Sequence, residues 1–141
     1  MSDFNLERFV SAQGDNFERA LSEIQSGKKR SHWMWFIFPQ MKGLGRSMTA
    51  DFYGIASLDE AMEYLAHPVL GPRLREISEA LLSLPEDLKA ITIFGSPDWM
   101  KLRSCMTLFD TISPDDVFAK VLDRYFNGRR CDLTLNMIRK G

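Results

Sequence analysis

Aromatic and polar side chains that could bind a small molecule are concentrated between residues 31 and 47. Trp33, Trp35 and Phe38 carry too much apolar surface for a solvated loop, so this run is expected to pass through the core. A polar segment that contains two glycines follows at once, with the side chains of Gln40, Lys42, Arg46 and Ser47. A buried run that ends in such a segment is the usual construction of a pocket wall.

Three polar residues of a later predicted helix, Asp98, Lys101 and Ser104, are expected to approach the same pocket, although Asp98 and Lys101 could simply pair. Aromatic faces stack against a ring, arginine and lysine bind phosphate, and glutamine and aspartate bond to polar edges. The set favours a nucleotide-like or phosphorylated ligand, bound without turnover or cleaved with Asp98 as the acid. The candidate ligand-binding residues are His32, Trp33, Trp35, Gln40, Lys42, Arg46, Ser47, Asp98, Lys101 and Ser104.

Two basic segments could contact an anion, but each has a plainer interpretation. Gly43–Ser47 lacks the spacing and the Gly-Lys-Ser/Thr ending of a Walker motif. If a helix begins at Ser47 or Thr49, its first amides would point at whatever this segment holds, with Arg46 beside them; a tight turn is the alternative. The run Lys28–Arg30 follows a predicted helix, where cations interact favourably with the helix dipole. A phosphate or nucleic-acid contact is the alternative for this run.

Other kinds of catalytic centre find little support in the sequence. Neither His32 nor His67 falls in a nucleophile signature, and no H-x-x-x-H, E-x-x-H or D-x-D pattern predicts a metal site. His67 precedes a proline and is expected to bond to backbone between two helices. Cys105 and Cys131 lack C-x-x-C spacing and are interpreted as small apolar core residues in a reducing compartment. We therefore predict no metal and no cofactor, and enzymatic activity stays open.

The spacing of apolar residues predicts an all-α, compact multihelical domain over residues 1–141, with almost no strand-like alternation. Ser31 could cap a short helix through Phe38, although the β-branched and aromatic content of this run is also typical of a strand. We assign Ser31–Phe38 to a helix because no other stretch offers it a strand partner. The expected cap residues are Asp3, Ser57 with Glu60, Ser96 before Pro97, Ser113 before Pro114, and Asp132, with Gly27 as a C-terminal glycine. The predicted helices include Leu6–Val10, Phe17–Ile24, Ser31–Phe38, Ala50–Tyr53, Leu58–Leu65, Leu70–Leu84, Leu88–Ile91, Trp99–Phe109, Val117–Tyr125 and Leu135–Ile138.

Composition narrows the classes of partner. The 141 residues are 45% hydrophobic and 26% charged, which is typical of a globular domain with one core. A formal net charge of −1 argues against nucleic-acid binding by overall positive charge. No run approaches the roughly 18 apolar residues that cross a bilayer, and the first residues do not form a signal peptide. We expect a cytoplasmic protein, monomeric or weakly dimeric, that does not bind membranes.

Several longer motifs resemble one bacterial family. They are His32–Gln40, Gly43–Ser47, Glu60–Gly71, Ile93–Asp98 and Lys101–Phe109, and they match the family designated domain of unknown function 1810. The resemblance extends from about Phe4 to Leu135. It implies an all-helical, compact fold similar to that of a mycobacterial relative, and it brings no reaction, cofactor or catalytic residue.

A helical protein-protein interaction module without a small-molecule ligand is the alternative function. Eight methionines are adaptable at binding surfaces, although they equally fill gaps in a core. A closed pocket on which Lys42, Arg46 and Asp98 converge would favour the ligand. An exposed apolar patch larger than about 600 Å² would favour the protein partner.

Overall fold

A computed structural model describes residues 4–140, and the described part contains ten helices. Their bounds are α1 Glu7–Gln13, α2 Phe17–Gln25, α3 Met34–Ile37, α4 Met48–Tyr53, α5 Leu58–Ala66, α6 Leu70–Leu82, α7 Ala90–Phe94, α8 Asp98–Ile112, α9 Val117–Phe126 and α10 Asp132–Lys140. Within residues 4–140, strand-like pairing is limited to an isolated bridge between Met41 and Ile55. The predicted all-α fold class is therefore confirmed.

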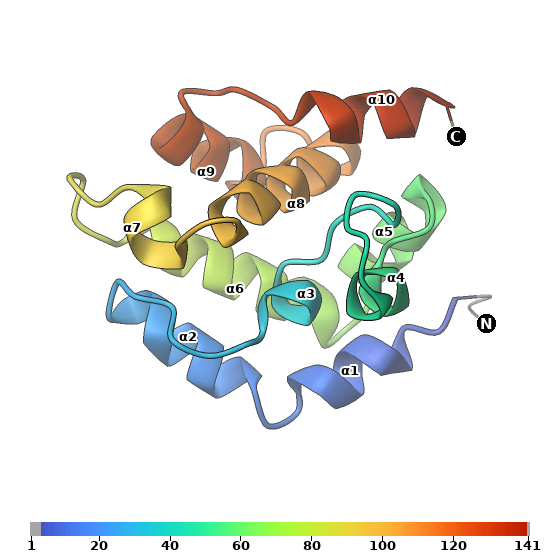
Figure 1. The fold of residues 1–141 in the computed structure, drawn as a ribbon, viewed down its shortest axis with the longest axis horizontal. Coiled ribbons are helices and arrows are strands. Elements are labelled where there is room, and N and C mark those ends of the chain that lie inside the picture. Colours follow the sequence, from blue (N-terminus) through green and yellow to red (C-terminus); the bar gives the residue numbers. More distant parts are fainter. Residues whose placement is uncertain (1–3, 141) are drawn as a thin grey trace.

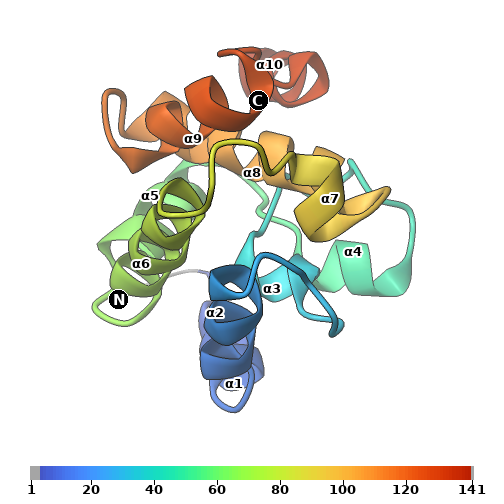
Figure 2. The same ribbon diagram turned by 90° about the vertical axis from the view of Figure 1, so that its left-hand side faces the viewer.

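The two longest helices, α6 and α8, occupy the middle of the molecule. Figures 1 and 2 show α1 and α2 at one end and α9 and α10 at the other. Helix α8 packs against α5, α7, α9 and α10, while α6 packs against α2, α5 and α9. Helices α1–α3 and α5–α9 contribute buried side chains to one core cluster, and α4 and α10 pack partly buried residues against it. Helix α8 packs both against the C-terminal helices α9 and α10 and against the earlier helices α5 and α7. A site between the two ends of the molecule can therefore include residues of α8.

The aromatic run between residues 33 and 38 divides between the core and a partly exposed position. Trp33 and Phe38 are each 1% exposed, and both rings contact Phe94, at centroid distances of 6.4 and 5.9 Å. Trp35, which the sequence places in the core with them, is only half-buried. Met34 and Ile37 take the inner face of the single turn α3, because residues three apart share a helix face, and Trp35 between them points elsewhere.

The helix boundaries predicted at Ser57 and Gly27 are confirmed, whereas the caps predicted at Ser96, Ser113 and Asp132 are not. Asp132 is the first residue inside α10, and Glu60 reaches back to the Ala56 amide instead of that of Ser57. Ser57 Oγ accepts from the Glu60 amide at 3.2 Å, and Gly27 has a φ of +81°. Helix α8 instead begins at Asp98 after a cis Ser96–Pro97 bond, without the side-chain cap expected from Ser96. Asp3, the cap expected for the first helix, lies outside the described residues.

The start of α9 moves three residues beyond the predicted cap, Ser113. Asp116 caps it through a 2.7 Å bond from the Val117 amide to its carboxylate. The Ser113 hydroxyl and the Arg75 guanidinium donate to the other carboxylate oxygen, at 2.8 and 3.0 Å. Asp116 is the better cap because a carboxylate accepts several charge-assisted bonds at once.

The helix predicted over Ser31–Phe38 is present as the single turn α3, and a carboxylate organises the residues before it. Glu23 of α2 accepts from the backbone amides of Arg30 and Ser31 at 2.7 and 3.0 Å. It also accepts from the Ser31 hydroxyl at 2.6 Å and from Trp33 Nε1 at 2.8 Å. Ser31 is thus a partner of Glu23 and not a helix cap.

This arrangement predicts a pH-dependent contribution of Glu23 to stability. Burial opposes ionisation, but the hydrogen bonds from Ser31, Arg30 and Trp33 outweigh it and lower the pKa of Glu23 from 4.5 to about 2. Since the folded-state pKa is depressed, the contribution is complete above about pH 4.5 and is lost as the pH falls towards 2. We expect Glu23→Gln to lower the free energy of unfolding by about 1–3 kcal/mol at pH 7, and by progressively less below pH 4.5, in urea titrations.

Glu18→Gln is the matched control, because Glu18 lies exposed on the same helix. Equal losses for the two variants at pH 7, or a Glu23→Gln loss that persists at pH 2.5, would contradict the assignment.

Candidate functional site

A cavity of about 450 Å³ lies where α3, the segment before α4, the first half of α8 and the start of α10 meet. These elements are found in Figure 1 to the right of centre, with α10 above and α3 and α4 below. Six of the ten candidate residues line the cavity: Trp35, Gln40, Arg46, Ser47, Lys101 and Ser104. Residues outside the candidate set complete it, namely Leu44, Gly45, Pro97, Met100, Arg103, Cys131 and Leu133.

The segment that carries Arg46 and Ser47 is an excursion whose two ends are tied together. Backbone bonds join Lys42 N to Ile55 O at 2.8 Å and Ile55 N to Gln40 O at 2.9 Å. Ser47 caps α4 by accepting from the Ala50 amide at 3.0 Å. Helix α4 therefore begins at one of the two positions predicted, immediately after Arg46.

Gly45 lets this segment pack closely on the indole of Trp35. A Cβ at this position would lie 3.0 Å from the Trp35 ring and 2.5 Å from the Ala50 Cβ, closer than van der Waals contact allows. Only glycine fits without a shift of its neighbours. The contact fixes the spacing between Trp35 and the Arg46 that follows.

The other four candidates lie outside the lining of this cavity. His32 is exposed, and Trp33 is buried with its Nε1–H bound to Glu23. Lys42 lines a separate hollow with Ser57, Asp59 and Met137, and its backbone amide is bound to the Ile55 carbonyl beside the Met41–Ile55 bridge. Asp98 does not line the cavity, but it is paired with Lys101, which does line it. Lys42, Arg46 and Asp98 thus do not converge on one pocket.

Asp98 lies between two ammonium groups. Its carboxylate oxygens are each 2.9 Å from a lysine Nζ, one from Lys29 and one from Lys101. Burial opposes ionisation of Asp98, yet the bonds from Lys101 and Lys29 outweigh it and hold the pKa of the carboxyl below its ordinary value. Asp98 is therefore a fixed carboxylate that positions Lys101, whose Nζ lies 3.8 Å from the centroid of the Trp35 ring.

Two arginines on the cavity have no carboxylate partner. Among the described residues, neither Arg46 nor Arg103 forms an ion pair, and no Asp or Glu belongs to the lining. Arg46 is exposed, whereas Arg103 packs its guanidinium over the rings of Trp99 and Phe126, 5.7 and 6.0 Å from their centroids. The charge of the lining is positive.

Gln40 adds an unused amide to this set. The residue is 8% exposed, and its side chain makes no hydrogen bond within residues 4–140. No Gln40 atom is among the fully buried polar atoms of the described residues that lack a partner, so solvent or a ligand can reach this amide. A donor and an acceptor are thus available beside the two arginines.

Sequence reasoning missed Arg103 and Cys131. Arg103 could have been found, because it follows Pro97 and Met100 at helical spacing and precedes Ser104 on the same helix. Cys131 carried no such signal, since it reaches the cavity through the turn between α9 and α10.

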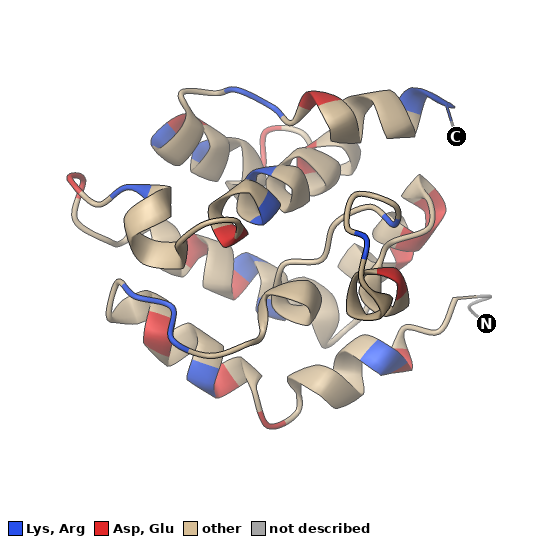
Figure 3. Cartoon of the chain, viewed as in Figure 1, with Lys and Arg blue, Asp and Glu red and all other residues tan. Residues whose placement is uncertain are grey.

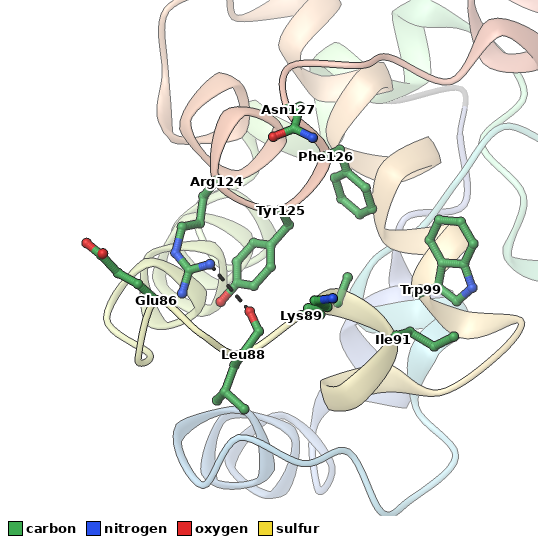
Figure 4. A pocket seen from close by; sticks show the side chains of 10 residues that line it. Glu86, Leu88, Lys89, Ile91, Trp99, Arg124, Tyr125, Phe126 and Asn127 are labelled. Atoms are coloured by element: carbon green, nitrogen blue, oxygen red, sulfur yellow. Dashed lines mark hydrogen bonds between the residues drawn. The ribbon is translucent and has the colours of Figure 1, made fainter.

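A second cavity, of about 430 Å³, lies between the segment before α7 and the end of α9 (Figure 4). The arginine in its lining, Arg124, is bound within the protein. It donates to the carbonyls of Leu84, Pro85 and Leu88, at 3.3, 2.6 and 3.4 Å. Arg124 therefore ties α9 to the turn after α6. This cavity offers an aromatic wall and Lys89, but a carboxylate, Glu86, also lines it, and the arginine in its lining is not available to a ligand.

No three His, Cys, Asp or Glu side chains within residues 4–140 are placed to hold a metal ion. In the same part of the chain, none of the helices combines the length and the apolar character that crossing a membrane requires.

Comparisons with other proteins agree with the observed fold. The crystal structure of the conserved hypothetical protein Rv1873 from Mycobacterium tuberculosis superposes with a TM-score of 0.95, at 41% sequence identity. The match covers 98% of this chain and 99% of that one. No curated protein gives a significant match. The model of the family described as "Protein of unknown function (DUF1810)" matches residues 3–138, and the chain accordingly belongs to the DUF1810 family.

Proposed function

We propose that the protein binds a small anionic molecule, nucleotide-like or phosphorylated, in the cavity between α3, α8 and α10. The observation that carries the proposal is the pair Arg46 and Arg103, which line one cavity without a carboxylate among its described walls. Guanidinium groups bind phosphate and carboxylate through paired, charge-assisted hydrogen bonds. An anion in the cavity would supply the partner that both residues lack.

The remaining walls suit an organic body attached to the anion. Trp35, Leu44, Met100 and Leu133 supply apolar surface, and Gln40 supplies an amide. A volume of about 450 Å³ falls within the range of pockets for small ligands and cofactors. A nucleotide or a sugar phosphate combines these features in one molecule.

Binding without turnover is the form of the proposal that the residues support. Asp98, the acid considered for bond cleavage, is held as a carboxylate by Lys29 and Lys101, so it has no proton to donate at neutral pH. Its contribution is to fix Lys101 at the edge of the cavity.

The alternative is a protein-interaction module, and one observation favours it. Apolar side chains near the cavity are exposed: Met48 by 89%, Leu133 by 66% and Met100 by 43%. Exposed apolar groups that surround a pocket can bind a partner protein, but they can equally close over the apolar part of a ligand. The ligand screen described below separates these two functions.

We place the protein in the cytoplasm as a monomer or weak homodimer that does not use nucleic acid as its partner. Cys105 and Cys131 are both buried free thiols, which suits a reducing compartment. In Figure 3 both basic and acidic residues are spread over the whole ribbon, and neither sign is confined to one part of it. Nucleic-acid binding relies on basic residues clustered on one face.

The direct test is a thermal-shift screen with nucleotides, ADP-ribose, dinucleotides and sugar phosphates. A ligand at 100 times its Kd stabilises the folded protein by about 2.7 kcal/mol, which is on the order of 10 °C for a domain of this size. We expect Arg46→Gln and Arg103→Gln each to raise the Kd of the hit by about ten-fold or more, measured by calorimetry, because each removes a charged partner.

Lys42→Gln is the matched control, because it removes the same charge from the same segment but on the side of the other hollow. Its Kd should equal that of the unaltered protein. A screen with no hit, or a hit whose affinity survives both arginine substitutions, would reject the site and favour the interaction module.

A further inference from the structure

The aromatic wall of the 450 Å³ cavity is already occupied on one face. Among the described residues that line this cavity, Trp35 is the one with an aromatic ring. The Lys101 ammonium nitrogen lies over that ring, 3.8 Å from its centroid. At the outer end of the ring, Gly45 packs so closely that a Cβ at this position would lie 3.0 Å from Cη2 and 3.3 Å from Cζ3. Lys101 and Gly45 both line the cavity, so a ring that enters it meets them together with the indole.

An ion pair holds Lys101 in this position. Asp98, one turn earlier on α8, is 2.9 Å from Lys101 Nζ, and the two side chains are only 19% and 18% exposed. The other Asp98 oxygen lies 2.9 Å from the Nζ of Lys29, whose side chain is 9% exposed. Lys29 Nζ also donates to the Ser31 carbonyl at 2.6 Å. Lys29 therefore fixes Asp98, and Asp98 fixes Lys101.

A ligand ring could stack on this face of Trp35 only after the ammonium had left it. A cation over an indole is attracted by the negative face of the ring, and the attraction grows when the cation is partly desolvated. Moving Lys101 away would lose this attraction and would leave Asp98 with one of its two partners. A ligand without an aromatic ring needs no such displacement.

The rest of the lining suits a ligand of that kind. The apolar side chains other than Trp35 are aliphatic, and the Gln40 amide, which makes no hydrogen bond within residues 4–140, can bond to a hydroxyl group. The Lys101 ammonium has three N–H groups and gives one of them to Asp98. The other apolar lining residues are Leu44, Pro97, Met100 and Leu133.

We propose that Lys101 determines the specificity of this site by occupying the face of Trp35, so that the cavity takes a phosphorylated molecule with an aliphatic, hydroxyl-bearing body, a sugar phosphate, in preference to a nucleotide. The inference rests on the proposed function, because it names the class of anion that is bound there. Asp98 is a positioning residue in this arrangement, since it acts through Lys101.

The test compares ribose 5-phosphate and AMP by isothermal titration calorimetry. The two probes share the ribose and the phosphate and differ in the adenine ring. We expect ribose 5-phosphate to bind about ten-fold more tightly than AMP or better, because adenine can stack on this face of Trp35 only by displacing the ammonium. Equal Kd values, or tighter binding of AMP, would overturn the proposal.

Two substitutions of Lys101 separate its charge from its bulk. Lys101→Met removes the ammonium and keeps an unbranched side chain, so it should lower the ratio of the AMP Kd to the ribose 5-phosphate Kd by about ten-fold. Lys101→Arg should retain the ratio, since a guanidinium also stacks on an indole. A ratio that Lys101→Met leaves unchanged would overturn the role of Lys101.

Lys120→Met is the matched control, because Lys120 is exposed on α9 and is absent from the lining of the cavity. Both Kd values should equal those of the unaltered protein. Proton NMR gives a second readout: the ring current of Trp35 should shift the methylene protons beside the Lys101 ammonium upfield, and the shift should persist with ribose 5-phosphate bound. Loss of the shift in that complex would show that the ammonium leaves the indole, against the proposal.

Failure here is distinguishable from failure of the proposed function. If a nucleotide binds more tightly than ribose 5-phosphate and its affinity depends on Arg46 and Arg103, anion binding stands and selection by Lys101 falls. If neither probe binds and the ligand screen gives no hit, the proposed function falls and this inference falls with it.

Discussion

Replacing Trp33 by alanine is expected to lower the free energy of unfolding by about 3–5 kcal/mol, whereas Trp35→Ala should cost much less, about 1–2 kcal/mol. Trp33 is 1% exposed, contacts the rings of Phe38 and Phe94, and donates from Nε1 to Glu23. Its removal opens a cavity in the core and takes one hydrogen bond from Glu23. Trp35 is half-buried on the 450 Å³ cavity, so water can occupy much of the space that it leaves.

Chemical denaturation gives both free energies, and ligand titration provides the second comparison. Trp35→Ala should weaken binding of a ligand found in the screen, because it removes a wall of the cavity. Trp33→Ala, measured where the variant is still folded, should bind with nearly unchanged affinity. A Trp35→Ala loss equal to that of Trp33→Ala would mean that both rings belong to the core and that the cavity lacks this wall.

These two tryptophans show how far the sequence could predict the fold. Apolar spacing located the long helices, and the Ser57–Glu60 pair and Gly27 marked helix ends, because those signals depend on residues three or four positions apart. The run from Trp33 to Phe38 is apolar at every position, so no periodicity indicates which ring faces inward. That choice is made by Glu23 and Phe94, which come from α2 and α7.

The candidate site was predicted in part for a similar reason. Arg46 and Ser47 follow the aromatic run directly and share a cavity with Trp35, as the pattern of a buried run and a polar turn predicts. Lys42 belongs to the same turn but faces the other way, because the chain pairs with Ile55 at this point. Tertiary contacts decide that Lys42 lines a different hollow from Arg46, and they also bring Cys131 to the cavity.

A buried ion pair that no sequence pattern indicated anchors the segment carrying Arg46. Arg8 of α1 lies 2.9 Å from the Glu60 carboxylate, and their side chains are only 9% and 3% exposed. The same guanidinium donates to the carbonyls of Phe52 and Gly54, at 2.7 and 2.9 Å, just where α4 ends. Glu60 also accepts from the Ala56 amide at 2.7 Å. One side chain thus connects α1 to both ends of the loop between α4 and α5.

We expect Arg8→Met to lower the free energy of unfolding by about 3–5 kcal/mol, because it leaves the Glu60 charge buried without its partner. Urea denaturation of this variant, of Glu60→Met and of the double variant would measure the coupling between the two residues. The double variant should be more stable than the sum of the single losses predicts, since no unpaired charge remains. The double variant should still be less stable than the unaltered protein, because the carbonyls of Phe52 and Gly54 have lost the Arg8 donor. Additive losses, or a cost below about 1 kcal/mol for Arg8→Met, would show that the pair is solvated and contributes little to the position of α4.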